Sequence, residues 1–329
     1  MLFAVSKPTV HNENYVASIR SEKHRSYSAS EMNMTQYNNF PRYLASKKTV
    51  DDRALNQRVW DALAKSLNTY EDVYILEIGG GIGTMIERLL ERKALQHVRY
   101  TLLDEQPENI AAAKERLPKW ADEQNFTWHW DGDTLVLWKM GYQTRVDFLA
   151  EDLFDFLTRR PADQKYDLLI AHAFLDLVDI PATLPELFKT LKPNGNFYFT
   201  INFDGETIFE PAVTDDVEIM DAYHHTMDER IIDGKLSGDS HAGRHLFTHL
   251  RAAGGEIIEA GASDWVVFAP YPADEAYFLH FIVDTVRGAL DGKIAPQRIQ
   301  SWASARHAQI ERGTLVYIAH QLDFFGSVP

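Results

Sequence analysis

The sequence predicts an α/β protein with a doubly wound, mainly parallel sheet. Short apolar runs containing β-branched residues alternate with segments of helical periodicity, and parallel strands buried on both faces have this composition. The first run, residues 73–76, is followed by a glycine-rich turn and then by a helical segment that begins at Met85. A strand, a glycine turn and a helix in this order let the backbone approach a ligand closely, so we expect a nucleotide-cofactor site at this turn.

The spacing of the glycines separates two kinds of cofactor. A dinucleotide-binding turn has the pattern G-x-G-x-x-G/A, and counted from Gly79 its last position is Thr84. The pattern present is an acidic residue followed by alternating glycines. It resembles the first motif of class I S-adenosylmethionine (SAM) methyltransferases, which implies a Rossmann-like sheet of seven strands, SAM as cofactor and S-adenosylhomocysteine (SAH) as product. The resemblance assigns cofactor binding to Glu77, Gly79, Gly80, Gly81 and Gly83.

A second strand, predicted over residues 98–103, ends in Asp104 and Glu105. An acidic residue in this place can accept hydrogen bonds from both ribose hydroxyls, and the resemblance assigns this role to Asp104, with Glu105 beside it. Enzymes that bind NAD use the same arrangement, so this feature alone does not separate the two classes. Asp104 is also suited to capping the helix that begins near Pro107.

A third strand, residues 146–150, leads into Asp152 and Leu153. The resemblance implies that these two residues hold the adenine amino group; the alternative for Asp152 is a solvated loop carboxylate. Strands predicted at 166–172 and 196–201 follow, and the first of them ends in His172, where the family places residues that touch the cofactor. The resemblance covers residues 72–203, with a recognisable end at 314–325.

The chain is longer than a bare cofactor domain, so we expect an N-terminal arm, residues 1–50, before a methyltransferase domain of residues 51–329 with three insertions. Residues 118–142 predict a hairpin whose tryptophans either line a surface or cover the sheet edge. Residues 204–244 follow the fifth strand and are placed to cover a methyl acceptor. Residues 270–313 predict two helices that wall the active site, mediate assembly or pack in the core.

A helix is predicted from Arg53 to Leu67, with Asp51 and Asp52 as its caps. In the resembled family such a leading helix often lies over the cofactor. Three aromatic residues precede it and either close the pocket or pack in the core: Tyr37, Phe40 and Tyr43.

Methyl transfer from a sulfonium is an in-line displacement, and an alcohol, phenol or ammonium acceptor also needs a base that removes a proton. His224 and His225 lie in the expected cap, four residues before Asp228 and Glu229, so each pair predicts either an oriented base or a surface ion pair. Asn202, just past the fifth strand, is placed to hydrogen-bond the acceptor. The candidate catalytic residues are therefore His224, His225 and Asn202. We find no compact ligand pattern and expect no metal.

The 329 residues carry a formal net charge of −15, which disfavours a nucleic-acid partner because such contacts depend on Lys and Arg facing phosphates. The chain has no cysteine, which removes disulfides, thiol nucleophiles and thiolate zinc sites and fits a cytoplasmic location. No long apolar segment predicts a signal peptide or a membrane span. The expected partner is a small organic acceptor, and the helical insertion is compatible with a homodimer.

The sequence thus predicts a cytoplasmic, SAM-dependent methyltransferase that acts on an O, N or C atom of a small molecule. Two alternatives stay open, an NAD(P)-dependent oxidoreductase and a catalytically silent SAM-binding scaffold. Thr84 in place of a third glycine weakens the first alternative. Cofactor binding without turnover would favour the second.

Overall fold

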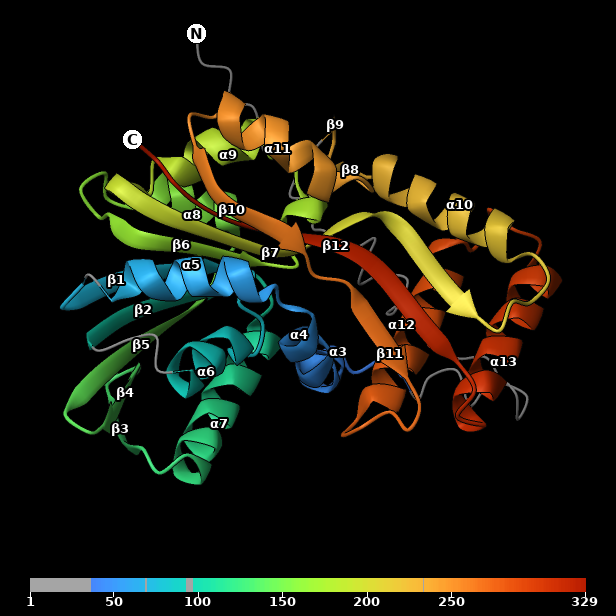
Figure 1. The fold of residues 1–329 in the computed structure, drawn as a ribbon, viewed down its shortest axis with the longest axis horizontal. Coiled ribbons are helices and arrows are strands. Elements are labelled where there is room, and N and C mark those ends of the chain that lie inside the picture. Colours follow the sequence, from blue (N-terminus) through green and yellow to red (C-terminus); the bar gives the residue numbers. More distant parts are fainter. Residues whose placement is uncertain (1–36, 69, 93–96, 233) are drawn as a thin grey trace, which may run out of the picture.

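The computed structural model describes residues 37–329 apart from residues 69, 93–96 and 233, so most of the predicted N-terminal arm lies outside the described residues. A ten-stranded sheet runs through the molecule in the order β10-β12-β7-β6-β1-β2-β5-β4-β3, with β11 paired to β12 (Figure 1). Its strands are β1 (Asp72–Ile78), β2 (His97–Asp104), β3 (Thr127–Asp131), β4 (Thr134–Lys139), β5 (Tyr142–Ala150), β6 (Tyr166–His172), β7 (Leu191–Glu210), β10 (Glu256–Ala262), β11 (Trp265–Phe268) and β12 (Val316–Ser327).

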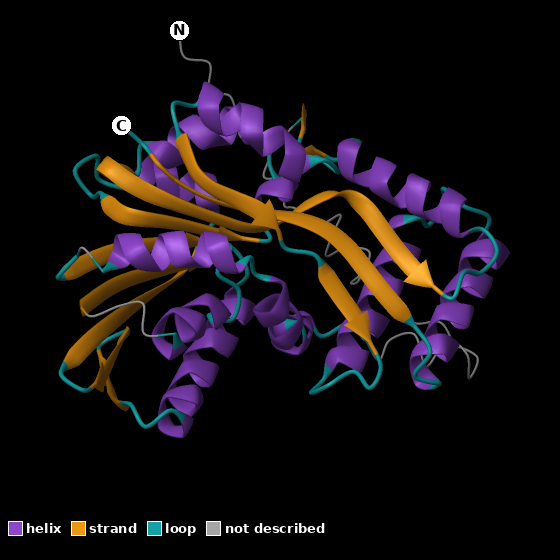
Figure 2. Ribbon diagram, in the orientation of Figure 1, coloured by secondary structure: helices purple, strands orange, loops and turns teal. Residues whose placement is uncertain are grey.

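The strands β7, β6, β1, β2 and β5 are parallel to one another, and helices cover both faces of this central part (Figure 2). One face packs against α5 (Gln57–Leu67), α6 (Thr84–Glu91) and α7 (Pro107–Glu123), and the other against α8 (Leu153–Arg159), α9 (Ile180–Phe188) and α11 (Ala242–Ala252). Every residue of β6 is buried, as its continuous apolar run predicts. In the described part of the chain, no helix is long and apolar enough to cross a membrane.

The fold class predicted from the sequence is confirmed. The seven expected strands are the five parallel strands, β12, which pairs antiparallel with β7, and β10, which pairs antiparallel with β12. The sheet is larger than predicted because the hairpin β3–β4 adds two strands to one edge and β11 adds another at β12. Residues 256–268 form two strands, β10 and β11, which residues 263 and 264 separate.

The hairpin predicted between Phe126 and Trp138 is present as β3 and β4, with Thr127 opposite Trp138 and Gly132 at the turn. It continues the sheet by pairing β4 antiparallel to β5. Trp128 packs against the core cluster beneath α7, whereas Trp130 is partly exposed. The hairpin thus extends and covers the edge of the sheet.

The strands β7, β11 and β12 extend beyond the parallel part and carry a separate hydrophobic core (Figure 1). The helices α10 (Asp216–Asp228), α12 (Glu275–Ala289) and α13 (Pro296–Glu311) pack there around Phe209, Phe278, Trp302 and Tyr317. The predicted insertions 204–244 and 270–313 therefore share one core. Residues 204–210 continue β7 rather than beginning the cap, and the short strands β8 (Ile231–Ile232) and β9 (Lys235–Leu236) follow α10.

Two short helices, α3 (Phe40–Ser46) and α4 (Lys48–Ala54), precede α5. The prediction that Asp51 and Asp52 cap a single helix is wrong, because both residues lie inside α4. The cap of α5 is Asn56, whose side-chain oxygen accepts hydrogen bonds from the backbone N–H groups of Arg58 and Val59. Both carboxylates contact Arg88 instead, and that of Asp52 also contacts Lys48.

Candidate functional site

The glycine turn connects β1 to α6 at the carboxyl end of the parallel strands. Gly79 and Gly81 have φ angles of +61° and +55°, which residues that carry a Cβ rarely adopt. A Cβ at Gly79 would lie 2.5 Å from the Phe174 ring, and one at Gly81 would lie 3.0 Å from Cδ1 of Leu44. Both the conformation and the close neighbours therefore require glycine here.

Asp104, the last residue of β2, joins the glycine turn to the start of α7. Its Oδ2 accepts a hydrogen bond from the backbone N–H of Gly81 at 2.8 Å, and its Oδ1 accepts from the Gln106 N–H at 2.9 Å and from Asn109 Nδ2 at 3.0 Å. Burial raises the pKa of Asp104, against the lowering effect of these donors. The neighbouring Glu105 is exposed and accepts a hydrogen bond from the Gln106 side chain.

Glu77, the acidic residue of the glycine motif, is buried in the sheet beside the turn. Its carboxyl accepts a hydrogen bond from the Tyr100 hydroxyl at 2.7 Å. Burial raises the pKa of Glu77 to about 8, so the group is largely protonated at neutral pH. A Cβ at Gly80 would lie 3.0 Å from Oε2 of Glu77, so the carboxyl packs directly under the turn.

Asp152 and Leu153 lie where β5 passes into α8. The Asp152 carboxylate caps this helix by accepting hydrogen bonds from the N–H groups of Phe154 at 2.8 Å and Asp155 at 3.1 Å. Leu153 is buried. Asp152 is therefore a structural helix cap, and its predicted contact with adenine stays a prediction.

His172, the last residue of β6, is buried and hydrogen-bonded through both ring nitrogens. Its Nδ1 lies 2.8 Å from the Thr200 hydroxyl, and its Nε2 lies 3.0 Å from Oδ2 of Asp51. Burial lowers the pKa of His172 to about 4, although Asp51 opposes this effect. The imidazole is thus neutral at physiological pH.

Asp51 links α4 to the turn through a buried group of charges. Its carboxylate lies 3.3 Å from both Lys47 and Arg88, and its Oδ1 accepts a hydrogen bond from Nε1 of Trp265 at 2.9 Å. Burial alone would raise the pKa of Asp51, but Lys47, His172 and Arg88 together hold it well below its usual value. Arg88 is itself buried in α6, one turn after the glycine motif.

The helices α3 and α4 lie between the glycine turn and α12. Leu44 approaches Gly81, while Tyr43 stacks on Phe281 of α12 with ring centroids 4.1 Å apart. The other two aromatic residues considered at this end also pack against α12, with Tyr37 stacked on His280 and Phe40 near Phe281. These aromatic side chains therefore pack against α12, with Tyr37 and Tyr43 half-buried and Phe40 exposed.

The two candidate catalytic histidines of α10 have different surroundings. His224 is half-buried, with Nε2 3.0 Å from the Thr207 hydroxyl, and burial lowers its pKa. Its expected partner Asp228 instead accepts hydrogen bonds from Ser240. His225 does meet Glu229, at 3.0 Å, but both side chains are largely exposed. That pair is the surface ion pair considered as the alternative, and it does not form an enclosed base.

Asn202, the third catalytic candidate, lies fully buried within β7. Its Nδ2 donates to the backbone carbonyl of Leu322 at 2.8 Å, and its Oδ1 has no hydrogen-bond partner among the described residues. The side chain thus bonds to the neighbouring strand β12. The expected contact with an acceptor has no support from this position.

A cluster of ligand-forming side chains escaped the sequence analysis. Asp239, in the loop before α11, lies close to His245 and His249 of this helix. The spacing of His241, His245 and His249, four residues apart, places them on one face of a helix and was visible in the sequence. The carboxylate that completes the cluster lies in an irregular loop, so its approach could not be predicted from periodicity.

Comparison with known proteins identifies the central part of the chain. Residues 76–197, which run from β1 into β7, match the family model of a methyltransferase domain. This match confirms the resemblance found in the sequence and SAM as the cofactor class. No curated protein sequence matches the chain.

Several solved structures are similar to the chain over most of its length. A SAM-dependent methyltransferase from Thiobacillus denitrificans in complex with SAH is 16% identical to this chain. The alignment covers 84% of this chain and 93% of that protein, with a TM-score of 0.44. YjhP from E. coli is 16% identical, with coverage of 85% and 98% and a TM-score of 0.43. The cyclopropane synthase MmaA2 from Mycobacterium tuberculosis is 10% identical, with coverage of 84% and 88% and a TM-score of 0.43.

Proposed function

We propose that this protein transfers the methyl group of SAM to a small organic acceptor, because residues 76–197 match the family model of a methyltransferase domain. The observation that carries the proposal is the contact between the glycine turn and Asp104. Gly81 donates its N–H to a carboxylate at the end of the adjacent strand, so the turn and the acidic residue form one surface. A nucleoside that touches the glycines would also reach this carboxylate.

The roles of the cofactor-binding residues follow from this surface. The backbone of residues 79–83 would contact the cofactor, and the carboxylate of Asp104 would accept hydrogen bonds from the ribose hydroxyls. Asp152 and Leu153 would contact the adenine from the end of β5. His172, neutral and held by Thr200 and Asp51, would support the wall of the site rather than exchange protons.

His224 is the residue we assign as general base for an acceptor that must lose a proton. Among the three candidates it combines partial burial with a pKa below the usual value, so its imidazole is neutral and able to accept a proton at neutral pH. Nε2 of His224 lies 3.0 Å from the hydroxyl of Thr207 on β7. The proposal requires the reacting atom of the acceptor to lie within hydrogen-bond reach of this imidazole.

The first test is calorimetric titration of the full chain with SAH and, in parallel, with NADH. Micromolar binding of SAH alone is the expected result. Binding of NADH alone would establish the oxidoreductase alternative instead. Binding of neither cofactor would contradict the proposed function.

A second test separates an enzyme from a silent scaffold. Release of SAH from SAM is followed with alcohol, phenol, amine and carboxylate acceptors. With an active acceptor, His224→Gln should lower kcat by about 100-fold or more while SAH affinity stays unchanged. SAH binding without turnover of any acceptor class would favour the scaffold.

A further inference from the structure

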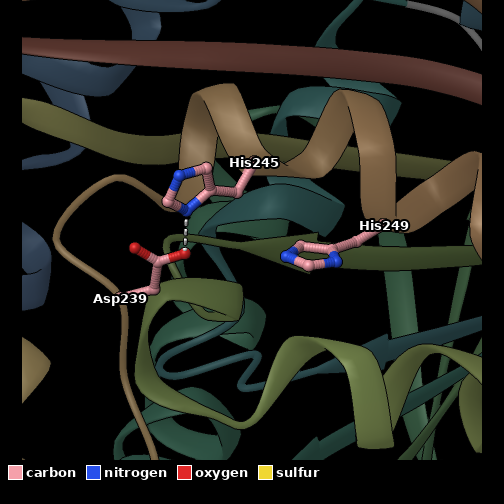
Figure 3. Close-up of side chains that lie close together, drawn as sticks. All are labelled: Asp239, His245 and His249. Atoms are coloured by element: carbon pink, nitrogen blue, oxygen red, sulfur yellow. Dashed lines mark hydrogen bonds and ion pairs between the residues drawn. The ribbon is translucent and has the colours of Figure 1, made fainter.

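The cluster of Asp239, His245 and His249 offers three metal-ligating side chains in one place (Figure 3). One ligand atom from each residue lies within 4.8 Å of the corresponding atoms of the other two. The shortest separation is 2.7 Å, between Nδ1 of His245 and Oδ2 of Asp239. Two ligands on one zinc ion at bond lengths of about 2.0–2.2 Å are at most about 4.3 Å apart, so only small side-chain movements are needed to close the cluster around an ion.

The two histidines are held by a rigid helix. They lie four residues apart on α11, so their side chains project from the same face (Figure 3). An adjacent face of this helix, about 100° around its axis, carries Leu246 and Leu250, which are fully buried in the core against β7 and α9. Packing of these leucines fixes the position of the helix and hence of both imidazoles.

The carboxylate of Asp239 is oriented by its own surroundings. Its Oδ1 accepts a hydrogen bond from the backbone N–H of His241 at 2.8 Å, which leaves Oδ2 directed at His245. The backbone N–H of Asp239 donates to the carbonyl of Asp176 at 3.3 Å. The next residue, Ser240, is fully buried and donates from its N–H and hydroxyl to Asp228. Contacts of this kind around a ligand orient it before the ion arrives.

The donor set determines the class of ion. Two imidazole nitrogens and one carboxylate oxygen suit a borderline divalent metal such as Zn²⁺, whereas Ca²⁺ and Mg²⁺ prefer oxygen ligands alone. Three protein ligands leave at least one coordination position for water or another molecule. The His245 side chain is 51% exposed and that of Asp239 is 21% exposed, so solvent reaches this position.

We propose that Asp239, His245 and His249 form a binding site for a divalent metal of the zinc type, with one coordination position open to solvent. This site goes beyond the proposed methyl transfer and does not depend on it. A second group, Asp228, Asp239 and His241, shares the same carboxylate. The test must therefore distinguish a site formed with His245 and His249 from one formed with His241.

The test measures metal binding directly. The full chain, freed of affinity tags and of metal, is titrated with Zn²⁺ by calorimetry and with Co²⁺ by visible absorption. We expect one Zn²⁺ per chain, and we expect His249→Asn and Asp239→Asn each to weaken binding by at least tenfold. Circular dichroism of each variant establishes that the fold is intact, and His249→Gln serves as a second variant if His249→Asn does not fold.

The matched control is His320→Asn. Nδ1 of His320 lies 2.7 Å from Oδ1 of Asp264, the same separation as in the His245–Asp239 pair, and among the described residues no third ligand completes a triad there. This variant should bind Zn²⁺ as the parent protein does. The proposal would be overturned by absence of one-to-one binding, by equal weakening in His320→Asn, or by loss of binding in His241→Asn with full binding in His249→Asn.

Discussion

The imidazole of His172 and the carboxylate of Asp51 lie 3.0 Å apart, although 121 residues separate them in the chain. The contact joins the end of β6 to α4, in front of the parallel strands. Because Arg88 of α6 contacts the same carboxylate, one acidic side chain holds together three elements around the glycine turn. A neutral histidine completes the group without adding a third positive charge to those of Lys47 and Arg88.

Asp51→Asn should destabilise the protein by about 3–5 kcal/mol, because it leaves the buried Lys47 without this carboxylate and the buried Arg88 with only Asp52 as its negative partner. Urea denaturation measures the change. The control is Asp274→Asn, which breaks the exposed pair with Arg42 and should cost about 1 kcal/mol or less. Equal effects of the two substitutions would show that the buried group does not hold α4 in place.

Gly81→Val should abolish SAH binding, because the new side chain meets Leu44 and displaces the turn from its ligand-facing path. The matched control is Gly132→Val in the β3–β4 hairpin, where φ is +61° but a Cβ would meet nothing within 4 Å. Both variants should lose about 1–2 kcal/mol of stability from the left-handed backbone. Calorimetry with SAH then separates them, and normal affinity in Gly81→Val would contradict the assignment of the turn.

Asp104→Asn should weaken SAH binding by about 1–3 kcal/mol, since it removes the charged acceptor proposed for the ribose hydroxyls. Glu105→Gln, one residue along and exposed, is the control and should leave the affinity nearly unchanged. Thermal melting of both variants without ligand measures the change in stability that follows from losing the hydrogen bond with Gly81, and so separates it from the change in SAH affinity. If Glu105→Gln weakens SAH and Asp104→Asn does not, the ribose contact belongs to Glu105.

Glu77 should make the protein less stable as the pH rises. Its pKa is raised from 4.5 to about 8 in the folded state, so its contribution is fully present below pH 4.5 and is lost as the pH rises through 8. Glu77→Gln keeps the size of the side chain but removes this titration. The free energy of unfolding of Glu77→Gln relative to the parent should therefore increase between pH 5 and pH 8.5, by about 5 kcal/mol at most. Parallel pH curves for the two proteins would contradict the shifted pKa.

Much of the fold was predictable because buried parallel strands leave strong local patterns. The strands at β1, β2, β5 and β6 and the glycine turn all appear where their apolar runs and glycines predict them. The end of β7 was missed. Its continuation through residues 205–210 begins with a glycine and two polar residues, and it is stabilised by pairing with β12, which is more than 100 residues away in sequence.

The arrangement of side chains in the candidate site was less predictable because partners come from distant segments. Helical spacing correctly predicted the contact between His225 and Glu229. The contact that it predicted between His224 and Asp228 is absent, because Asp228 accepts hydrogen bonds from the N–H and hydroxyl of Ser240 instead. In the same way, Asp51 was expected as a helix cap but lies in a buried group with Arg88 and His172. Local periodicity indicates which residues lie on the same face of a helix. Which contacts they form also depends on hydrogen-bond donors from distant segments of the chain that need an acceptor.

The position of β12 has a consequence for how the protein is made. This strand lies between β7 and β10, and its residues enter all three hydrophobic cores, with Phe325, Phe324 and Tyr317 each in a different one. During synthesis on the ribosome, none of the cores can close before residues 316–327 have emerged. The nascent chain would thus expose the unpaired edge of β7 until residues 316–327 have emerged, and a chaperone that shields strand edges would act in that interval.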